Sequence, residues 1–184
     1  MKKISYNSPV ILTFALISLI ALILNGITQG RSNTLLFSTY RSSLTDPLMY
    51  VRLFTHVLGH SSIQHYTNNM MLLLLLGPML EEKYGSKNML LCILATAFIT
   101  GVLNNLLFRT GLLGASGIVF MMIVMSSMTS MKSGTLPLTF VLILFIYLGQ
   151  EVYSAIFASD NISQFTHIIG GLCGGFLGYS LKKR

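Results

Sequence analysis

The chain has 184 residues, of which 53% are hydrophobic and 9% charged, with a formal net charge of +7. Soluble domains carry about 25% charged residues, so this composition excludes an ordinary soluble domain and favours a membrane protein. The basic residues lie at the ends of apolar stretches rather than in one patch, which argues against nucleic-acid binding. A chain of this length, with several spans, has room for one domain, residues 1–184.

Six apolar stretches are long enough, or nearly so, to cross about 30 Å of hydrocarbon as helices. They cover residues 9–28, 62–80, 89–108, 115–131, 136–157 and 165–181. No small-residue cleavage site follows the first stretch, so we expect a retained helix rather than a signal peptide. Residues 29–61 form a long connection, which is usually functional or partly structured. The sequence thus predicts an all-α integral membrane protein with six transmembrane helices.

Six spans place both chain ends on one side of the membrane, and the basic residues indicate which side. With both ends in the cytoplasm, eight basic residues lie inside and four outside, which agrees with the positive-inside tendency. The inner set is Lys2, Lys3, Lys83, Lys87, Lys132, Lys182, Lys183 and Arg184, and the outer set is Arg31, Arg41, Arg52 and Arg109. We therefore expect a multi-pass protein of the cell membrane with cytoplasmic termini.

The fourth span opens with the residues Gly114-Ala115-Ser116-Gly117 at the outer face. Small neighbours leave the Ser116 hydroxyl unshielded, and N–H groups at a helix start have no partner within the helix, so they can bind an anion. A serine nucleophile needs a base, and imidazole has a suitable pKa near neutral pH. His167 is the only histidine of the sixth span. The two residues are a candidate catalytic pair, the alternative being polar residues that only pack.

The depth of three polar residues can be estimated from the basic residue that ends each span. Ser116 lies 16 residues before Lys132, His167 15 residues before Lys182 and Asn69 14 residues before Lys83. At 1.5 Å per residue these separations are about 24, 22 and 21 Å, so the three residues lie at nearly one level. His65 and Asn69 share a helix face and can both donate hydrogen bonds, which suits an oxyanion hole beside Ser116.

Small and aromatic residues favour close contact between the fourth and sixth spans. Gly170, Gly174 and Gly178 recur every four residues, a pattern that lets helix backbones approach closely in membranes. Phe120 follows Ser116 by one helical turn. Its ring either stacks on His167 or belongs to the core.

The remaining polar residues suggest no metal or cofactor. His60 and His65 would lie about 140° apart on a helix, and no carboxylate or thiolate accompanies them at ligand spacing. We expect His56 and His60 to be structural, and Glu151, near the outer end of the fifth span, has no assigned role. No acid is well placed as a third catalytic member, which favours a Ser–His dyad.

These motifs resemble those of the rhomboid family of intramembrane serine proteases. The resemblance rests on Gly114-Ala115-Ser116-Gly117, on His167 with Gly170-Gly171 and Gly174-Gly175, on Phe54 through His65 and Asn69, and on Leu76 through Ser86. Many members carry a Trp-Arg pair in the first loop, for which Tyr40-Arg41 is the nearest substitute here.

The resemblance implies a six-helix bundle with a water-filled cavity that opens outward. It implies Ser116 as nucleophile, His167 as base, and His65, Asn69 and the Ser116 N–H as the oxyanion hole, with Gly114 and Phe120 beside them. Residues 158–164 would cap the cavity, and the fifth span would act as a gate. The expected reaction is cleavage of single-span membrane proteins in or beside their transmembrane segments, with no cofactor.

Two other functions remain open at this point. A rhomboid-like protein can bind and route membrane clients without cleaving them, although such proteins usually lack the serine or the histidine. A metal or proton transporter would use the histidines, but the spans offer no line of carboxylates.

Overall fold

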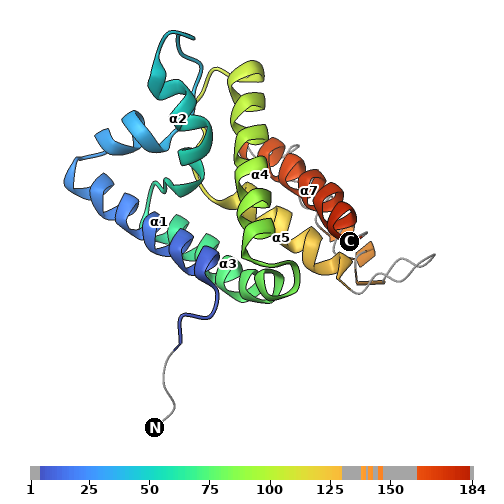
Figure 1. The fold of residues 1–184 in the computed structure, drawn as a ribbon. Coiled ribbons are helices and arrows are strands. Elements are labelled where there is room, and N and C mark those ends of the chain that lie inside the picture. Colours follow the sequence, from blue (N-terminus) through green and yellow to red (C-terminus); the bar gives the residue numbers. More distant parts are fainter. Residues whose placement is uncertain (1–4, 130–137, 140, 143–144, 147–160, 183–184) are drawn as a thin grey trace.

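The computed structural model describes residues 5–129, 138–139, 141–142, 145–146 and 161–182. Over these residues the chain is helical (Figure 1). The long helices are α1 (Pro9–Ile27), α3 (Ile63–Tyr84), α4 (Ser86–Leu107), α5 (Ser116–Met128) and α7 (Asn161–Lys182). The connection between α1 and α3 adds the π-helical segment η1 (Asn33–Phe37), helix α2 (Pro47–Thr55) and the 3₁₀ turn η2 (His56–Leu58).

These helices confirm the helical part of the predicted fold. The predicted spans 9–28, 62–80, 89–108, 115–131 and 165–181 correspond to α1, α3, α4, α5 and α7. Within the described residues, α1 and α4 have the length and apolar composition needed to cross a membrane, and α5 is apolar but shorter. Most of the predicted span 136–157 lies outside the described residues, as do residues 158–160 of the predicted cap, while 161–164 begin α7.

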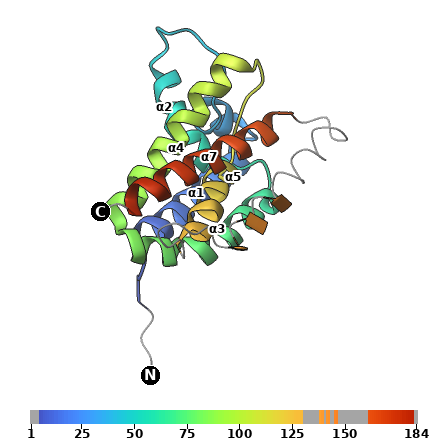
Figure 2. The same ribbon diagram turned by 90° about the vertical axis from the view of Figure 1, so that its right-hand side faces the viewer.

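The helices form two neighbouring pairs with α4 against both. Helices α5 and α7 lie side by side in two perpendicular views, and α1 runs along α3 (Figures 1 and 2). Helix α4 contacts α1, α2, α3, α5 and α7. The most extensive contact between described elements is that of α5 with α7.

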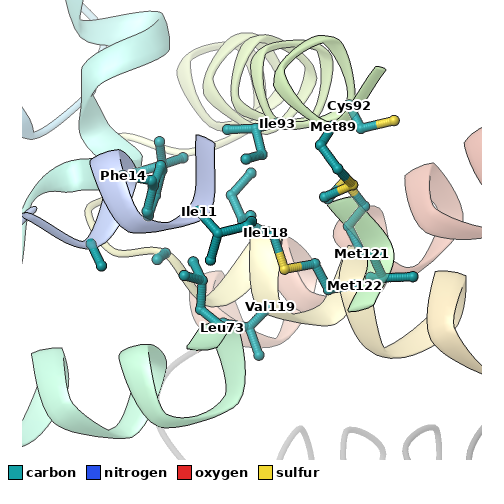
Figure 3. Packing of buried hydrophobic residues seen from close by; sticks show 14 of the residues in the cluster. Ile11, Phe14, Leu73, Met89, Cys92, Ile93, Ile118, Val119, Met121 and Met122 are labelled. Carbon is teal, nitrogen blue, oxygen red and sulfur yellow. The ribbon is translucent and has the colours of Figure 1, made fainter. Parts of the chain in front are cut away.

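The core is built from apolar residues of α1, α3, α4 and α5 (Figure 3). Ile11 of α1, Leu73 of α3 and Ile118 and Met121 of α5 have no exposed surface. Met121 and Met122 face Met89 of α4, and the flexible thioether side chains fill the irregular space between the helices.

The buried carboxylate of Glu81 joins the end of α3 to the start of α1. Its two oxygens accept the backbone N–H groups of Val10 at 3.1 Å and Ile11 at 3.0 Å. The first N–H groups of a helix have no partner within it, and Ser8, the N-cap of α1, makes no side-chain capping bond. A carboxylate also interacts favourably with the positive end of the helix dipole. Glu81 therefore satisfies donors that would otherwise be buried and unpaired.

We predict that Glu81→Leu lowers the free energy of unfolding by about 3 kcal/mol, because two buried N–H groups lose their acceptor. Glu81→Gln retains one oxygen acceptor, so its loss should be smaller. Denaturant unfolding of the purified protein measures both changes. The adjacent Glu82→Gln is the matched control, since Glu82 is exposed and should change stability by less than about 0.5 kcal/mol. Equal effects at the two positions would contradict this role of Glu81.

Candidate active site

Ser116 is the first residue of α5, and the loop before it is held from two sides. The backbone N–H of Gly114 donates to the His56 carbonyl oxygen at 3.0 Å. Thr39 and Leu112 exchange two backbone hydrogen bonds of 2.9 and 2.8 Å. The connection after α1 therefore fixes the turn that presents Ser116, whose side chain is partly buried.

The backbone of Gly114 makes room for two side chains of α3. Its φ of +120° is a conformation that favours glycine. A Cβ atom at this position would lie 2.7 Å from Nε2 of His65 and 3.9 Å from Nδ2 of Asn69. The structure thus brings His65 and Asn69 together beside Gly114, two positions before Ser116.

Asn69 is buried, with 7% of its surface exposed. Among the described residues, its Nδ2 has no hydrogen-bond acceptor. A buried donor of this kind costs free energy in the absence of a partner, so such groups often mark functional sites.

Helix α7 packs directly on the backbone of α5 just after Ser116. A Cβ at Gly170 would lie 2.2 Å from the carbonyl oxygen of Gly117, and one at Gly174 would lie 2.3 Å from that of Met121. The side chain of Thr166 reaches Gly117 from the same helix. Only residues without side chains permit this approach, which is the small-residue packing expected from the sequence.

This packing sets His167 beside the face of α5 that carries Ser116. Thr166, which precedes His167, and Gly170, which follows it by three positions, both contact Gly117. Its ring lies against the Phe120 ring, with centroids 4.2 Å apart and planes inclined by 37°. Because Phe120 follows Ser116 by one turn, the imidazole lies on the Ser116 side of the helix.

His56 and His60 belong to the connection before α3, where both are buried. The Nδ1 of His56 lies 3.2 Å from the Arg52 carbonyl oxygen, and its Nε2 lies 3.4 Å from the hydroxyl of Thr100 on α4. His60 contacts the His65 ring edge-on, with centroids 5.0 Å apart. The helical separation of 140° predicted between these two residues was wrong, because α3 begins only at Ile63.

Within the described ranges, no group of three His, Cys, Asp or Glu side chains is arranged to hold a metal ion. Cys92 and Cys173 are free and buried.

Arg52, which the sequence suggested only as an orientation signal, has a structural role. Arg52 is 2% exposed and pairs with Asp46 at 2.6 Å. Its guanidinium lies 4.5 Å from the centre of the Tyr40 ring. This hydrogen-bonded pairing holds the pKa of Asp46 below its ordinary value. Arg41 instead donates to the carbonyl oxygens of Asn105 and Leu106 at the end of α4, so Tyr40 and Arg41 act separately.

We predict that Gly170→Ala lowers the free energy of unfolding by about 2 kcal/mol, because its Cβ would overlap the Gly117 carbonyl and force the helices apart. Gly175→Ala on the same helix is the matched control, because its Cβ would meet nothing closer than 3.9 Å. Thermal and denaturant unfolding compare the two variants. A tolerated Gly170→Ala would contradict the direct backbone contact.

Burial lowers the pKa of His56 and of His60 from 6.5 to about 4. The unfolded chain binds these protons below about pH 6.5, whereas the folded protein does so only near pH 4. Stability should therefore be full above pH 6.5 and fall by about 1.4 kcal/mol per pH unit for each histidine as the pH drops toward 4. The free energy of unfolding, measured across this pH range, should depend on pH half as steeply through these two histidines in His60→Phe as in the wild type. An unchanged slope would contradict the burial of a neutral His60.

Comparison with known proteins gives one family. The family model described as the rhomboid domain matches residues 47–184, which include every candidate site residue. The rhomboid protease GluP of Bacillus subtilis is 33% identical over 159 residues, which are 83% of this chain and 30% of that protein. The rhomboid protease GlpG of Haemophilus influenzae is 26% identical over 137 residues, which are 72% of this chain and 71% of that protein.

The chain thus spans less than a third of the length of the first relative and most of the second. The matched region begins at the first residue of α2 and continues through α3, α4, α5 and α7. Together with the apolar helices, the match identifies a helical membrane protein. The chain belongs to the rhomboid family.

Proposed function

We propose that this protein is an intramembrane serine endopeptidase that uses a Ser116–His167 dyad. The observation that carries the proposal is the contact of the His167 ring with Phe120, one turn after Ser116 on α5, beside the contacts of Thr166 and Gly170 with Gly117. Both relatives described above are named rhomboid proteases, which supports the same reaction.

In this mechanism Ser116 attacks the peptide carbonyl while His167 accepts the hydroxyl proton. The C–N bond then breaks, and His167 returns the proton to the departing amine, leaving an acyl ester on Ser116. A water molecule then attacks this ester while His167 accepts its proton; the C–O bond to Ser116 breaks, His167 returns the proton to the Ser116 oxygen, and the new carboxyl group is released. Each step needs a base that can move one proton back and forth, which suits an imidazole without a metal or cofactor.

The negative charge that develops on the carbonyl oxygen needs donors already in place. We assign this role to His65, to Asn69 and to the backbone N–H of Ser116. The convergence of His65 and Asn69 on Gly114, together with the Asn69 amide that lacks an acceptor among the described residues, supports this assignment. Phe120 packs on the His167 ring and would limit its rotation.

The proposed substrates are single-span membrane proteins cleaved in or beside the spanning segment. His65 and Asn69 lie in the first two turns of α3, whereas Glu81 lies near its other end. The site is therefore at one end of the bundle, as the proposed topology requires. In that topology the termini are cytoplasmic and the site opens to the outer face of the cell membrane.

We predict that Ser116→Ala and His167→Ala each lower cleavage of a model single-span substrate by at least about 10³-fold, because each removes a group that acts in bond making. The assay uses purified protein in proteoliposomes with EDTA present throughout. Ser126→Ala is the matched serine control, since its hydroxyl bonds to the Ile123 carbonyl farther along α5. Equal cleavage by all variants would indicate a contaminating protease and contradict the dyad.

Asn69→Ala should lower kcat by about 10²-fold through loss of an anion donor. Its control is Asn68→Ala, because Asn68 is exposed and pairs with Gln64.

If the wild type binds substrates without cleaving any, the protein instead belongs to the client-binding class. Activity that EDTA abolishes would favour a metal-dependent mechanism.

A further inference from the structure

Two consecutive serines hold His65 from different sides. Ser62 is the N-cap of α3, and its hydroxyl accepts the backbone N–H of His65 at 3.1 Å. The hydroxyl of Ser61 lies 3.2 Å from Nδ1 of the His65 ring. The backbone and the ring of His65 are thus held by separate hydrogen bonds. The hydrogen bond between Ser61 and the ring does not contribute to the helix cap, so it has another role.

The other ring nitrogen of His65 faces the candidate anion site. Nε2 lies 2.7 Å from the position that a Cβ would take at Gly114, and Asn69 Nδ2 approaches the same position. A neutral imidazole carries its proton on one nitrogen and a lone pair on the other. Nε2 can donate to an anion only if Nδ1 is the acceptor, and the partner of Nδ1 must then be a donor.

The neighbouring histidines show why the type of partner matters. Nδ1 of His56 lies 3.2 Å from the Arg52 carbonyl, and Nδ1 of His60 lies 3.1 Å from the Leu58 carbonyl. A carbonyl oxygen only accepts, so these two rings carry the proton on Nδ1. Of the three histidines in residues 56–65, His65 is the one whose Nδ1 meets a hydroxyl, which can donate.

The plane of the His65 ring is supported separately. The His60 ring contacts it edge-on, with an interplanar angle of 68°, and contacts Tyr66 at 83°. Since burial lowers the pKa of His60 to about 4, this neighbour is an uncharged ring at neutral pH. His60 thus holds the orientation of the His65 ring, and the hydroxyl next to Nδ1 is left to set its tautomer.

We propose that Ser61 is a positioning residue, whose hydroxyl donates to Nδ1 of His65 and thereby keeps the ring proton on Nε2, facing the oxyanion site. The inference rests on the proposed function for its catalytic consequence. The tautomer of His65 itself does not depend on substrate, so it can be measured independently of cleavage.

The first test is ¹⁵N NMR of the ring nitrogens in the full chain, labelled on its four histidines, at about pH 8 where a histidine is neutral. The His65 signals are assigned by their loss in His65→Gln. We expect Nε2 to be protonated and Nδ1 unprotonated in the wild type. Ser61→Ala should give a mixture of both tautomers, and Ser61→Thr, which keeps the hydroxyl, should restore the wild-type signals. A wild-type His65 with its proton on Nδ1 would overturn the proposal.

Two further variants separate positioning from stability. Ser43→Ala is the matched control, because Ser43 is an exposed serine of the same connection that bonds to Thr45 instead. It should leave the His65 signals unchanged. Ser62→Ala should lower the unfolding midpoint without changing the tautomer. A tautomer shift in Ser62→Ala equal to that in Ser61→Ala would contradict a specific role for Ser61.

The second test is kinetic. Ser61→Ala should lower kcat about fivefold with KM unchanged, the size expected for one hydrogen bond, and Ser61→Thr should recover it. If Ser116→Ala cleaves normally, the proposed function fails while the tautomer result still decides the role of Ser61. If Ser61→Ala keeps both the wild-type tautomer and the wild-type kcat, the inference fails while the proposed dyad stands.

Discussion

The contact between the backbones of α5 and α7 is the constraint on which the candidate site depends. Within lipid, apolar side chains gain little by leaving hydrocarbon for another helix, so close van der Waals packing drives helix association. Gly117 and Gly170 let the two backbones touch, and Thr166 packs beside them. That register puts His167 on the Ser116 side of α5 and against Phe120. The same glycines thus build the bundle and assemble the proposed dyad.

Three buried polar residues away from the proposed dyad connect separate parts of the fold. Glu81 accepts the first N–H groups of α1, and Arg52 is paired with Asp46 while its charge faces the Tyr40 ring. His56 joins the connection before α3 to the loop before Ser116 through its carbonyl oxygen. An unpaired polar group costs several kcal/mol in an apolar environment, so these pairings stabilise the connections between the helices.

Hydropathy and helical spacing predicted the long helices well, because burial in lipid is a local property of the sequence. The predicted stretch 9–28 ends within one residue of α1, and His65 and Asn69 lie on one face of α3 as expected. Sequence spacing could not identify the partners of Glu81, because the N–H groups of Val10 and Ile11 lie 71 and 70 residues away along the chain. The geometry of His60 was missed for a local reason, since its backbone lies in a loop before the helix start. The sequence therefore did not predict side-chain contacts between residues that only the folded chain brings together.

The central claim is that Ser116 is an activated nucleophile because α7 delivers His167 to it. A fluorophosphonate reacts with such a serine by forming an O–P bond and releasing fluoride, and it requires no peptide substrate. Intact-protein and peptide mass spectrometry of the treated wild type locates the adduct. We expect a single adduct on Ser116 that is lost in His167→Ala. An adduct on another serine, or equal labelling of Ser116 without His167, would contradict it.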